Sequence, residues 1–233
     1  MEHIKIGGIE KFSVVDFPNS IAAVVFMQGC PWRCPFCYNT HLQEAGKETE
    51  ISWPAFLEFL ERRKAVLDGV VFSGGEPLVQ NNLSAAMDDV IALGYKVGLH
   101  TGGYRPEALE KVLPKVDWVG LDIKAPLEAA RYKQATGCFD KVENVVQSLR
   151  LLINSGKDFE TRTTCDPRLL SIEDIYTMAA FLKTEGVKNY HLQKYRPIPS
   201  DKTTQDSECE KFFQDKDLVK YLSDTFEIFD LRK

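Results

Sequence analysis

The sequence predicts an α/β protein built on a mostly parallel β-sheet. Short apolar runs rich in β-branched and aromatic residues alternate with longer amphipathic segments along most of the 233 residues. This alternation is typical of βα units, whose strands lie parallel to one another. Six main strands are predicted, fewer than the eight of a closed β/α barrel. The pattern alone does not separate a partial barrel from an open, doubly wound sheet.

The predicted elements follow one another in a regular order. The first apolar run is too short for a helix, and five later runs are similar to it. The predicted strands span residues 21–26, 69–72, 95–99, 118–123, 159–164 and 190–193. The first predicted helix begins after Ser52, and the later ones span residues 83–93, 105–113, 140–154, 172–184 and 209–224. Ser52 and Ser171 suit helix N-caps and Gly156 suits a helix end, so these boundaries have a local signal.

The two ends of the chain fall outside this repeat. Residues 1–19 alternate loosely and end in a turn, so we expect a hairpin or extended lead-in there. Residues 201–233 are predicted to form a C-terminal helical extension, in which residues 226–229 could add an edge segment. We therefore expect one domain over residues 1–233, with the βα units in residues 20–200.

The composition argues against several classes of function. The chain is 44% hydrophobic and carries a formal net charge of −5, whereas a general nucleic-acid binder is usually basic. Its apolar stretches are far shorter than the ~18–20 residues that a transmembrane helix needs. The N-terminal residues carry charge without an apolar signal core. We therefore expect no nucleic-acid or membrane partner, and a reducing, cytoplasmic location in which the six cysteines are not paired.

Three cysteines lie close together directly after the first predicted strand. Cys30, Cys34 and Cys37 are spaced C-x3-C-x2-C, and two prolines stiffen this loop and exclude a regular helix. A stiff loop that gathers three thiolates can hold an iron–sulfur cluster. Because most clusters take four protein ligands, a fourth position remains for another residue or for a small molecule. The alternative is a zinc site, which His41 would complete as a fourth ligand.

A second polar loop follows the next predicted strand. It reads Ser73-Gly74-Gly75-Glu76-Pro77. Glycines let the backbone approach a ligand closely, and a glutamate can accept hydrogen bonds from an ammonium group. Since the carboxyl ends of parallel strands meet at one edge of a sheet, this loop should lie near the cysteine loop. A structural zinc site has no use for a second loop of this kind, so the pair of motifs favours a catalytic site.

The two motifs together resemble those of the radical S-adenosylmethionine (SAM) superfamily. The cysteine spacing, the aromatic Phe36 before the last cysteine and the Gly-Gly-Glu string carry the resemblance. It implies a partial barrel of six βα units in which Cys30, Cys34 and Cys37 hold one 4Fe–4S cluster. It also implies that SAM binds the fourth iron and that the loop containing Glu76 receives its amino group. The cluster would then split SAM to a 5′-deoxyadenosyl radical, which abstracts a hydrogen atom.

Other strand ends supply further candidates for cofactor contact. Asp122 and Lys124 place a carboxylate and an ammonium on one face by the two-residue period of a strand, and these groups could bind the charged methionine part of SAM. Polar and basic residues also lie at the ends of the last two predicted strands, in the runs that begin at Arg162 and at Gln193. They could contact ribose, carboxylate or a peptide backbone. The remaining candidates are Phe36, Asn39, Ser73, Gly74, Gly75, Glu76 and Thr101.

These loops also resemble those of the activating enzymes of glycyl-radical enzymes. The chain departs from their pattern at His100, where an aspartate is common, and at Gly102, where an asparagine is common. In a related activating enzyme that aspartate helps to hold a monovalent cation beside the cofactor. Because imidazole is a poor ligand for a hard cation, the pattern does not support that cation site here, although Asp122 remains.

Residues 4 to about 201 resemble the single-cluster activating proteins of anaerobic ribonucleoside-triphosphate reductases. The resemblance implies an oxidoreductase that removes a hydrogen atom from a glycine Cα of that partner, with flavodoxin or ferredoxin as a one-electron donor. The alternatives are activation of another glycyl-radical enzyme such as a formate-lyase, a small-molecule enzyme like the 7-carboxy-7-deazaguanine synthases, and a non-enzymatic cluster or zinc protein. Cys138, Cys165 and Cys209 form no second motif, and we expect them to be buried or incidental.

Overall fold

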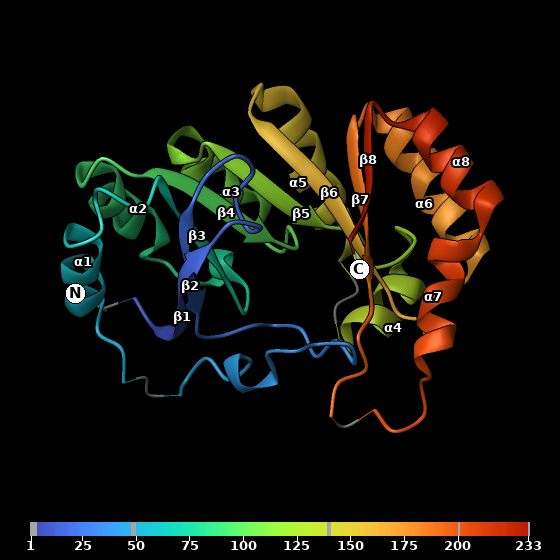
Figure 1. Ribbon diagram of the computed structural model, residues 1–233, viewed down its shortest axis with the longest axis horizontal. Helices are drawn as coiled ribbons and strands as arrows, with labels where there is room; N and C mark the ends of the chain where they lie inside the picture. Colours follow the sequence, from blue (N-terminus) through green and yellow to red (C-terminus); the bar gives the residue numbers. More distant parts are fainter. Residues whose placement is uncertain (1–3, 48–49, 139–140, 200, 233) are drawn as a thin grey trace.

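The computed structural model describes residues 4–47, 50–138, 141–199 and 201–232 (Figure 1). Within these ranges the strands form one eight-stranded sheet, ordered from β1 to β8 as in the chain. The first pair, β1 and β2, is antiparallel, and every later neighbouring pair is parallel. Because β1 and β8 lie at opposite edges, the sheet is not closed. The prediction of an α/β protein with a mostly parallel, partial barrel is confirmed.

The sheet contains the six predicted strands and one more at each edge. The strands are β1 (Ile6–Ser13), β2 (Ala22–Met27), β3 (Gly69–Gly74), β4 (Lys96–Thr101), β5 (Trp118–Asp122), β6 (Asp158–Cys165), β7 (Asn189–Lys194) and β8 (Ile228–Arg232). The lead-in supplies β1, and the edge segment predicted at residues 226–229 supplies β8. The strand β2 is buried along most of its length, as its unbroken apolar sequence requires in a parallel sheet covered on both faces.

Helices follow the parallel strands and lie along the outside of the curved sheet (Figure 1). They are α1 (Trp53–Glu61), α2 (Leu83–Ala92), α3 (Pro106–Val112), α4 (Ala129–Thr136), α5 (Val142–Ser155), α6 (Ile172–Glu185), α7 (Asp206–Gln214) and α8 (Lys216–Thr225). Three short 3₁₀ turns are η1 (Thr40–Leu42), η2 (Pro77–Val79) and η3 (Leu113–Lys115). The α6 start is a capping box, in which Asp174 N donates to Ser171 Oγ and Ser171 N donates to the Asp174 carboxylate.

Three features differ from the predicted elements. The helix α4 was not predicted, because its sequence is mostly polar and only one side of it is buried, through Tyr132, Ala135 and Thr136. The single C-terminal helix predicted over residues 209–224 is two helices, since the Asp215 side chain accepts from Leu218 N and starts α8 afresh. The helix predicted from residue 140 begins at Val142, and residue 140 itself lies outside the described residues.

The lead-in also fills the inside of the curved sheet. After β1, the chain turns inward so that the Phe17 ring stacks on Trp118 of β5, with 5.8 Å between the ring centroids. Phe17 is only 4% exposed and packs with Val24 and Val71 of neighbouring strands in a small core of its own. A larger core lies between the sheet and its helices. The inner core therefore forms a floor beneath the carboxyl ends of the strands.

None of the helices in the described part of the chain has both the length and the apolar character needed to cross a membrane.

The floor gives a first testable prediction. Replacing Phe17 by alanine should lower the free energy of unfolding by about 3–5 kcal/mol, because a buried ring is lost and a cavity remains. The control is Phe12→Ala in the same hairpin, since Phe12 is 53% exposed and its loss should change stability by no more than about 0.5 kcal/mol. Urea unfolding of the two variants measures both values. Equal effects would contradict this account of the floor.

Candidate functional site

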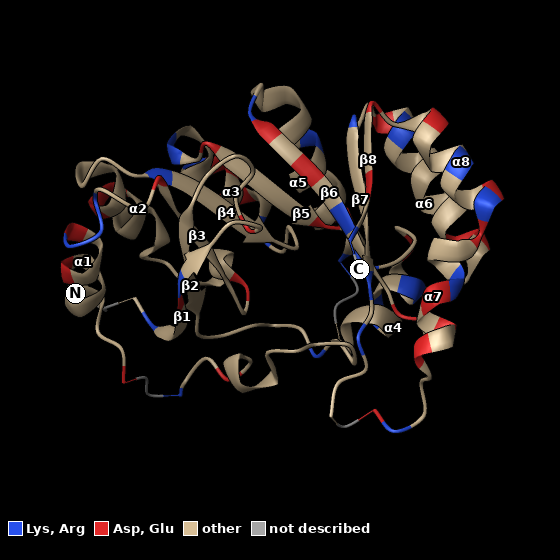
Figure 2. Cartoon of the chain, in the orientation of Figure 1, with Lys and Arg blue, Asp and Glu red and all other residues tan. Residues whose placement is uncertain are grey.

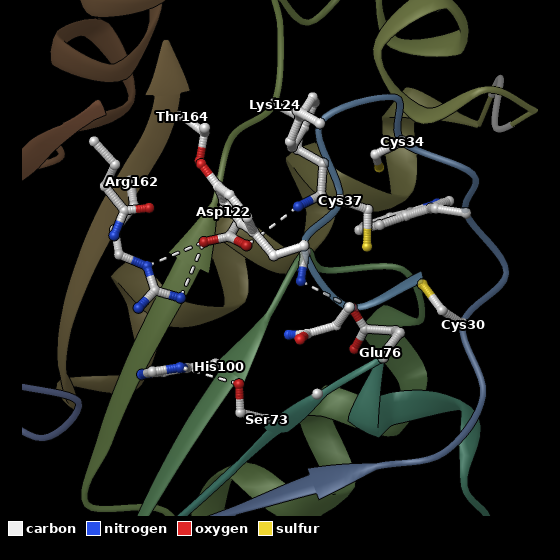
Figure 3. A pocket seen from close by; sticks show the side chains of 18 of the residues that line it. Cys30, Cys34, Cys37, Ser73, Glu76, His100, Asp122, Lys124, Arg162 and Thr164 are labelled. Atoms are coloured by element: carbon white, nitrogen blue, oxygen red, sulfur yellow. Dashed lines mark hydrogen bonds and ion pairs between the residues drawn. The ribbon is translucent and has the colours of Figure 1, made fainter. Parts of the chain in front are cut away.

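The carboxyl ends of the parallel strands surround one cavity of about 690 Å³ (Figure 3). The cysteine loop that follows β2 forms one side of it, and the ends of β5 and β6 form the opposite side. All of the residues predicted to bind the cluster or SAM line this cavity. They are Cys30, Cys34, Phe36, Cys37, Asn39, Ser73, Gly74, Gly75, Glu76, Thr101, Asp122, Lys124 and Gln193.

The cysteine loop is held by segments on either side of it. Gly29 N donates to Leu42 O at 2.7 Å and Cys30 N donates to Gln43 O at 3.2 Å, so the chain around η1 supports its start. Arg33 N donates to Thr136 O of α4 at 2.7 Å. The helix that the sequence did not predict is therefore one of the supports of this loop.

The three cysteines of the loop line the cavity together. One zinc ion would draw its sulfur ligands to about 2.3 Å from a single point, whereas a cluster carries each thiolate on a different iron. His41, the fourth residue of the zinc alternative, is exposed on η1. The geometry therefore does not favour that alternative.

Burial changes the acidity of two of these thiols. It raises the pKa of Cys30 to about 12 and that of Cys34 to about 11. Both are therefore protonated at neutral pH when no metal is bound. Because thiolates are the metal ligands, binding of a cluster must release these protons.

The two glycines of the second loop line the cavity and also allow a close contact within the chain. A Cβ on Gly75 would lie 2.1 Å from Gly29 O, and one on Gly74 would lie 2.3 Å from Met27 N. Their missing side chains therefore let this loop pack against the backbone that leads into the cysteine loop. Glu76 N completes the contact by donating to Gly29 O at 2.9 Å. The close approach that the glycines allow is to the chain itself.

Glu76 is the carboxylate that this contact places in the cavity. It is 1% exposed and accepts from Thr101 Oγ1 at 2.6 Å, Gly102 N at 2.8 Å and Leu78 N at 3.1 Å. Burial raises the pKa of Glu76, and these neutral donors only partly offset that effect. A carboxylate has about four acceptor positions, so capacity for a further donor remains. Thr101, predicted as a cofactor contact, directs its hydroxyl to Glu76 and fixes its orientation.

Asp122 lies across the cavity from Glu76, and cationic side chains compensate its negative charge fully. Lys124 Nζ lies 3.1 Å from Asp122 Oδ2, and the Arg162 guanidinium lies 3.0 Å from Oδ1 (Figure 3). Burial opposes ionisation of Asp122, but the two cations outweigh it and lower its pKa to about 2. Asp122 raises the pKa of Lys124 for the same reason, against the effect of burial. The Lys124 ammonium also lies 5.1 Å from the ring centroid of Trp32 in the cysteine loop.

His100 is a neutral bridge between two segments. Its Nε2 lies 3.0 Å from the carbonyl oxygen of Asp16, which can only accept, so Nε2 carries the proton. Nδ1 is then the acceptor for the Ser73 hydroxyl at 3.3 Å. Burial, with the nearby Arg162, lowers the pKa of His100 to about 3. Both ring nitrogens are thus engaged, and Asp122 is paired with Lys124 and Arg162.

The last three strands carry charged residues (Figure 2), of which Arg162, Lys194 and Arg232 line the cavity. Arg232, near the end of β8, binds Glu160 of β6 with two hydrogen bonds of 2.6 and 2.8 Å and also lines the cavity. His191 Nε2 lies 3.2 Å from the same carboxylate. Sequence reasoning missed Arg232, and it also missed Asp16 and Tyr38 of the lining. Tyr38 directly follows Cys37, so its place beside the motif was a signal that went unused. No local motif marks Arg232 and Asp16, because they meet the cavity only through the sheet order and the fold of the lead-in.

Of the three cysteines outside the motif, two are buried. Cys165 and Cys209 are 0% exposed and pack as small apolar side chains. Cys138 is exposed, and its thiol lies 3.0 Å from Pro31 O of the cysteine loop.

A profile of the Radical SAM superfamily matches residues 24–182, which is about two thirds of the chain. This chain belongs to the radical SAM superfamily. Its motifs for the cluster and SAM therefore belong to an enzyme, and the superfamily implies a 4Fe–4S cluster and SAM as cofactors. The three thiols face one cavity, and the Glu76 carboxylate beside them has an incompletely compensated charge. Both features suit that pair of cofactors.

Relatives of this radical SAM enzyme match it over nearly its whole length. A Methanocaldococcus jannaschii protein, provisionally named a glycyl-radical enzyme activating enzyme, is 26% identical over 96% of this chain and 98% of its own. The pyruvate formate-lyase-activating enzyme of Clostridium pasteurianum is 31% identical over the same shares of the two chains. The crystal structure of QueE from Escherichia coli shares the fold, with a TM-score of 0.57 and 16% identity over 99% of this chain and 94% of that one. The homologues thus include activating enzymes of glycyl-radical enzymes.

The low pKa of His100 predicts a pH dependence of stability. The unfolded histidine has a pKa near 6.5 and the folded one a pKa of about 3, so between these values the unfolded chain binds more protons. As the pH falls through this range, protonation of this histidine in the unfolded chain lowers the free energy of unfolding by up to about 1.4 kcal/mol per pH unit. His100→Gln should unfold with a shallower pH dependence than the wild type between about pH 6 and pH 4, measured by urea titration of the cluster-free proteins. Parallel curves for the two proteins would contradict burial of a neutral imidazole.

Proposed function

We propose that this enzyme holds one 4Fe–4S cluster through Cys30, Cys34 and Cys37 and removes a hydrogen atom from a glycine of a partner glycyl-radical enzyme. The observation that carries this proposal is that the three thiols and Glu76 line the same cavity. The Gly74-Gly75 turn fixes their mutual position by its contact with the start of the cysteine loop. When bound, the cluster supplies the electron that splits SAM and yields the radical that takes up the hydrogen atom.

Among the carboxylates that line the cavity, Glu76 and Asp122 differ in a way that assigns them different roles. Asp122 already has two cationic partners, and its pKa is lowered to about 2. Glu76 has neutral donors at hydrogen-bond distance, and its pKa is raised. An ammonium group would therefore stabilise ionised Glu76 more than ionised Asp122. This supports Glu76 as the group that receives the SAM amino group and Asp122 as the group that orients Lys124 and Arg162.

The remaining predicted residues would complete the SAM site. Lys124 lies within 5.9 Å of the Phe36 ring centroid and is fixed by Asp122, so it could interact with a carboxylate of the cofactor. Ser73, Asn39 and Gln193 line the cavity from three different segments. Their polar side chains suit the ribose and adenine groups, which need directional hydrogen bonds rather than charge.

The open sheet and the chemistry of glycine support a polypeptide substrate. The edges β1 and β8 do not pair with each other in the described chain, so the barrel has an unfilled side. Glycine lacks a side chain, and its Cα is therefore the backbone carbon most open to close approach. A glycine within a partner's loop could enter along this side and meet the cofactor within the cavity.

The partner that we propose first is an anaerobic ribonucleoside-triphosphate reductase, on the resemblance of the motifs across the chain. A formate-lyase is the second candidate, because the named activating enzyme of pyruvate formate-lyase from Clostridium pasteurianum is 31% identical over nearly the whole chain. One cluster and a one-electron donor such as flavodoxin or ferredoxin complete the proposal. The free thiols suit a reducing compartment such as the cytoplasm.

The cluster assignment is tested by anaerobic reconstitution with iron and sulfide. The reduced wild-type protein should give an EPR signal that changes when SAM is added, because one iron is free to bind it. Cys34→Ala should lose most of its bound iron and the response to SAM, whereas Cys165→Ala, a buried cysteine of the core between the sheet and its helices, should keep both. A Cys34→Ala protein that retains four irons and cleaves SAM would refute the assignment.

The partner is tested with reduced, reconstituted enzyme, SAM and purified candidate proteins. We expect a glycyl-radical EPR doublet to form on an anaerobic ribonucleotide reductase and not on the same protein with its radical glycine changed to alanine. A doublet formed only on pyruvate formate-lyase would favour the second candidate. Steady turnover of a small molecule without any protein partner would refute the activating role.

A further inference from the structure

The cysteine loop packs on its outer side against a group of residues from the chain around β6 and β7. We call Arg168, Tyr195, Arg196, Ile198 and Asp201 the loop brace. Arg168 follows β6, and the other four belong to the segment that leads from β7 toward α7. No sequence motif marks this group, and the superfamily profile ends before four of its five members.

The centre of the loop brace is an ion cluster in which Arg168, whose side chain is 31% exposed, binds two buried carboxylates. Its guanidinium lies 2.6 Å from Asp166 Oδ2 and 2.9 Å from Asp201 Oδ2, and these side chains are 0% and 1% exposed. Arg168 Nη2 also donates to Tyr195 OH at 2.9 Å, and that hydroxyl donates to Asp201 at 2.9 Å. Buried carboxylates depend on such pairing, so the Arg168 side chain is held firmly in one place.

The loop brace touches the second half of the cysteine loop at three points. Arg168 Nη2 donates to Pro35 O at 3.5 Å. The Phe36 ring packs with buried Tyr195 and with Ile198 in a small core that also contacts Cys34. The Arg196 backbone N–H donates to Tyr38 OH at 2.6 Å.

The first half of the loop has different supports. Its backbone bonds run from Gly29 and Cys30 to the chain around η1 and from Arg33 to α4. Within the second half, Cys37 N donates to Cys34 O at 3.1 Å, which closes a turn but does not anchor it. Among the described residues, the loop brace supplies the hydrogen bonds that tie this turn to β6 and β7, while Cys34 also packs against the main core and the Phe36 ring lies 5.9 Å from Lys124 Nζ.

We propose that Arg168 is a positioning residue that fixes Cys34 and Cys37 through Pro35 and Phe36. The proposal rests on the proposed function, because the placement of these thiols matters for chemistry only if they hold the cluster. Hydrogen bonding and solvent access around a cluster influence its electronic properties. The loop brace determines the hydrogen bonding and the solvent access of the second half of the loop, which carries Cys34 and Cys37.

The first measurement uses the full-length protein without a cluster. Hydrogen exchange of the peptide covering residues 33–38 reports how often this turn opens. In Arg168→Gln and in Tyr195→Phe, exchange of this peptide should be faster by about tenfold, since a hydrogen bond involving a charged group is lost. Tyr195→Phe keeps the ring that packs on Phe36 and so carries little risk of unfolding. The matched control is Arg150→Gln, which removes a bidentate arginine–carboxylate pair with Glu185 far from the loop.

The second measurement uses reconstituted, reduced protein with SAM. The EPR line shape of both brace variants should differ from that of the wild type, while that of Arg150→Gln should not. Unchanged exchange of residues 33–38 in both brace variants would overturn the proposal, and so would an equal rise in exchange across the whole sheet, which marks general destabilisation. Altered exchange with an unaltered EPR spectrum would also overturn it. Failure of the cluster to form in the wild type would instead overturn the proposed function.

Discussion

The close contact between the Gly74-Gly75 turn and the start of the cysteine loop is the constraint on which the site depends. A side chain on either glycine would collide with the backbone of Met27 or Gly29. Parallel pairing of β2 with β3 brings the two loops to the same edge of the sheet, but only the missing Cβ atoms let them touch. As a consequence, Glu76 is held beside the thiols, and the two motifs keep a fixed position relative to each other.

The electrostatics of the cavity follow from how its charges are paired. Asp122 and Glu160 have cationic partners within hydrogen-bond distance, and their pKa values are each lowered to about 2 against the effect of burial. Glu76 is buried among neutral donors, and its pKa is raised. Since an incompletely compensated buried charge is costly, a cationic group placed beside Glu76 would lower that cost. The neutral His100 adds no competing charge there.

Much of this arrangement was predictable because its signals are local. Apolar runs of strand length gave the six inner strands, and the spacing of the cysteines with the Gly-Gly-Glu string located the main loops. The order of parallel strands then implied that these loops meet. Other features had no such signal: α4 is short and polar outside, and the break at Asp215 divides a segment with continuous helical character. The approach of the two glycines to a ligand stays a prediction, and their contact with the backbone before the cysteine loop was not foreseen, since sequence does not tell which backbone a glycine approaches.

The sequence by itself determined the fold class, the cofactor motifs and the position of each motif along the chain. These depend on periodicity and on the chemistry of neighbouring residues. The tertiary structure decided that Thr101 serves Glu76, that Arg162 pairs with Asp122 and that Arg168 supports the cysteine loop from its outer side. Such contacts join residues distant in sequence, and their energies depend on burial and on distances of a few ångströms. Only the folded chain fixes those quantities, and so only the structure could show which charges in the cavity remain for a ligand.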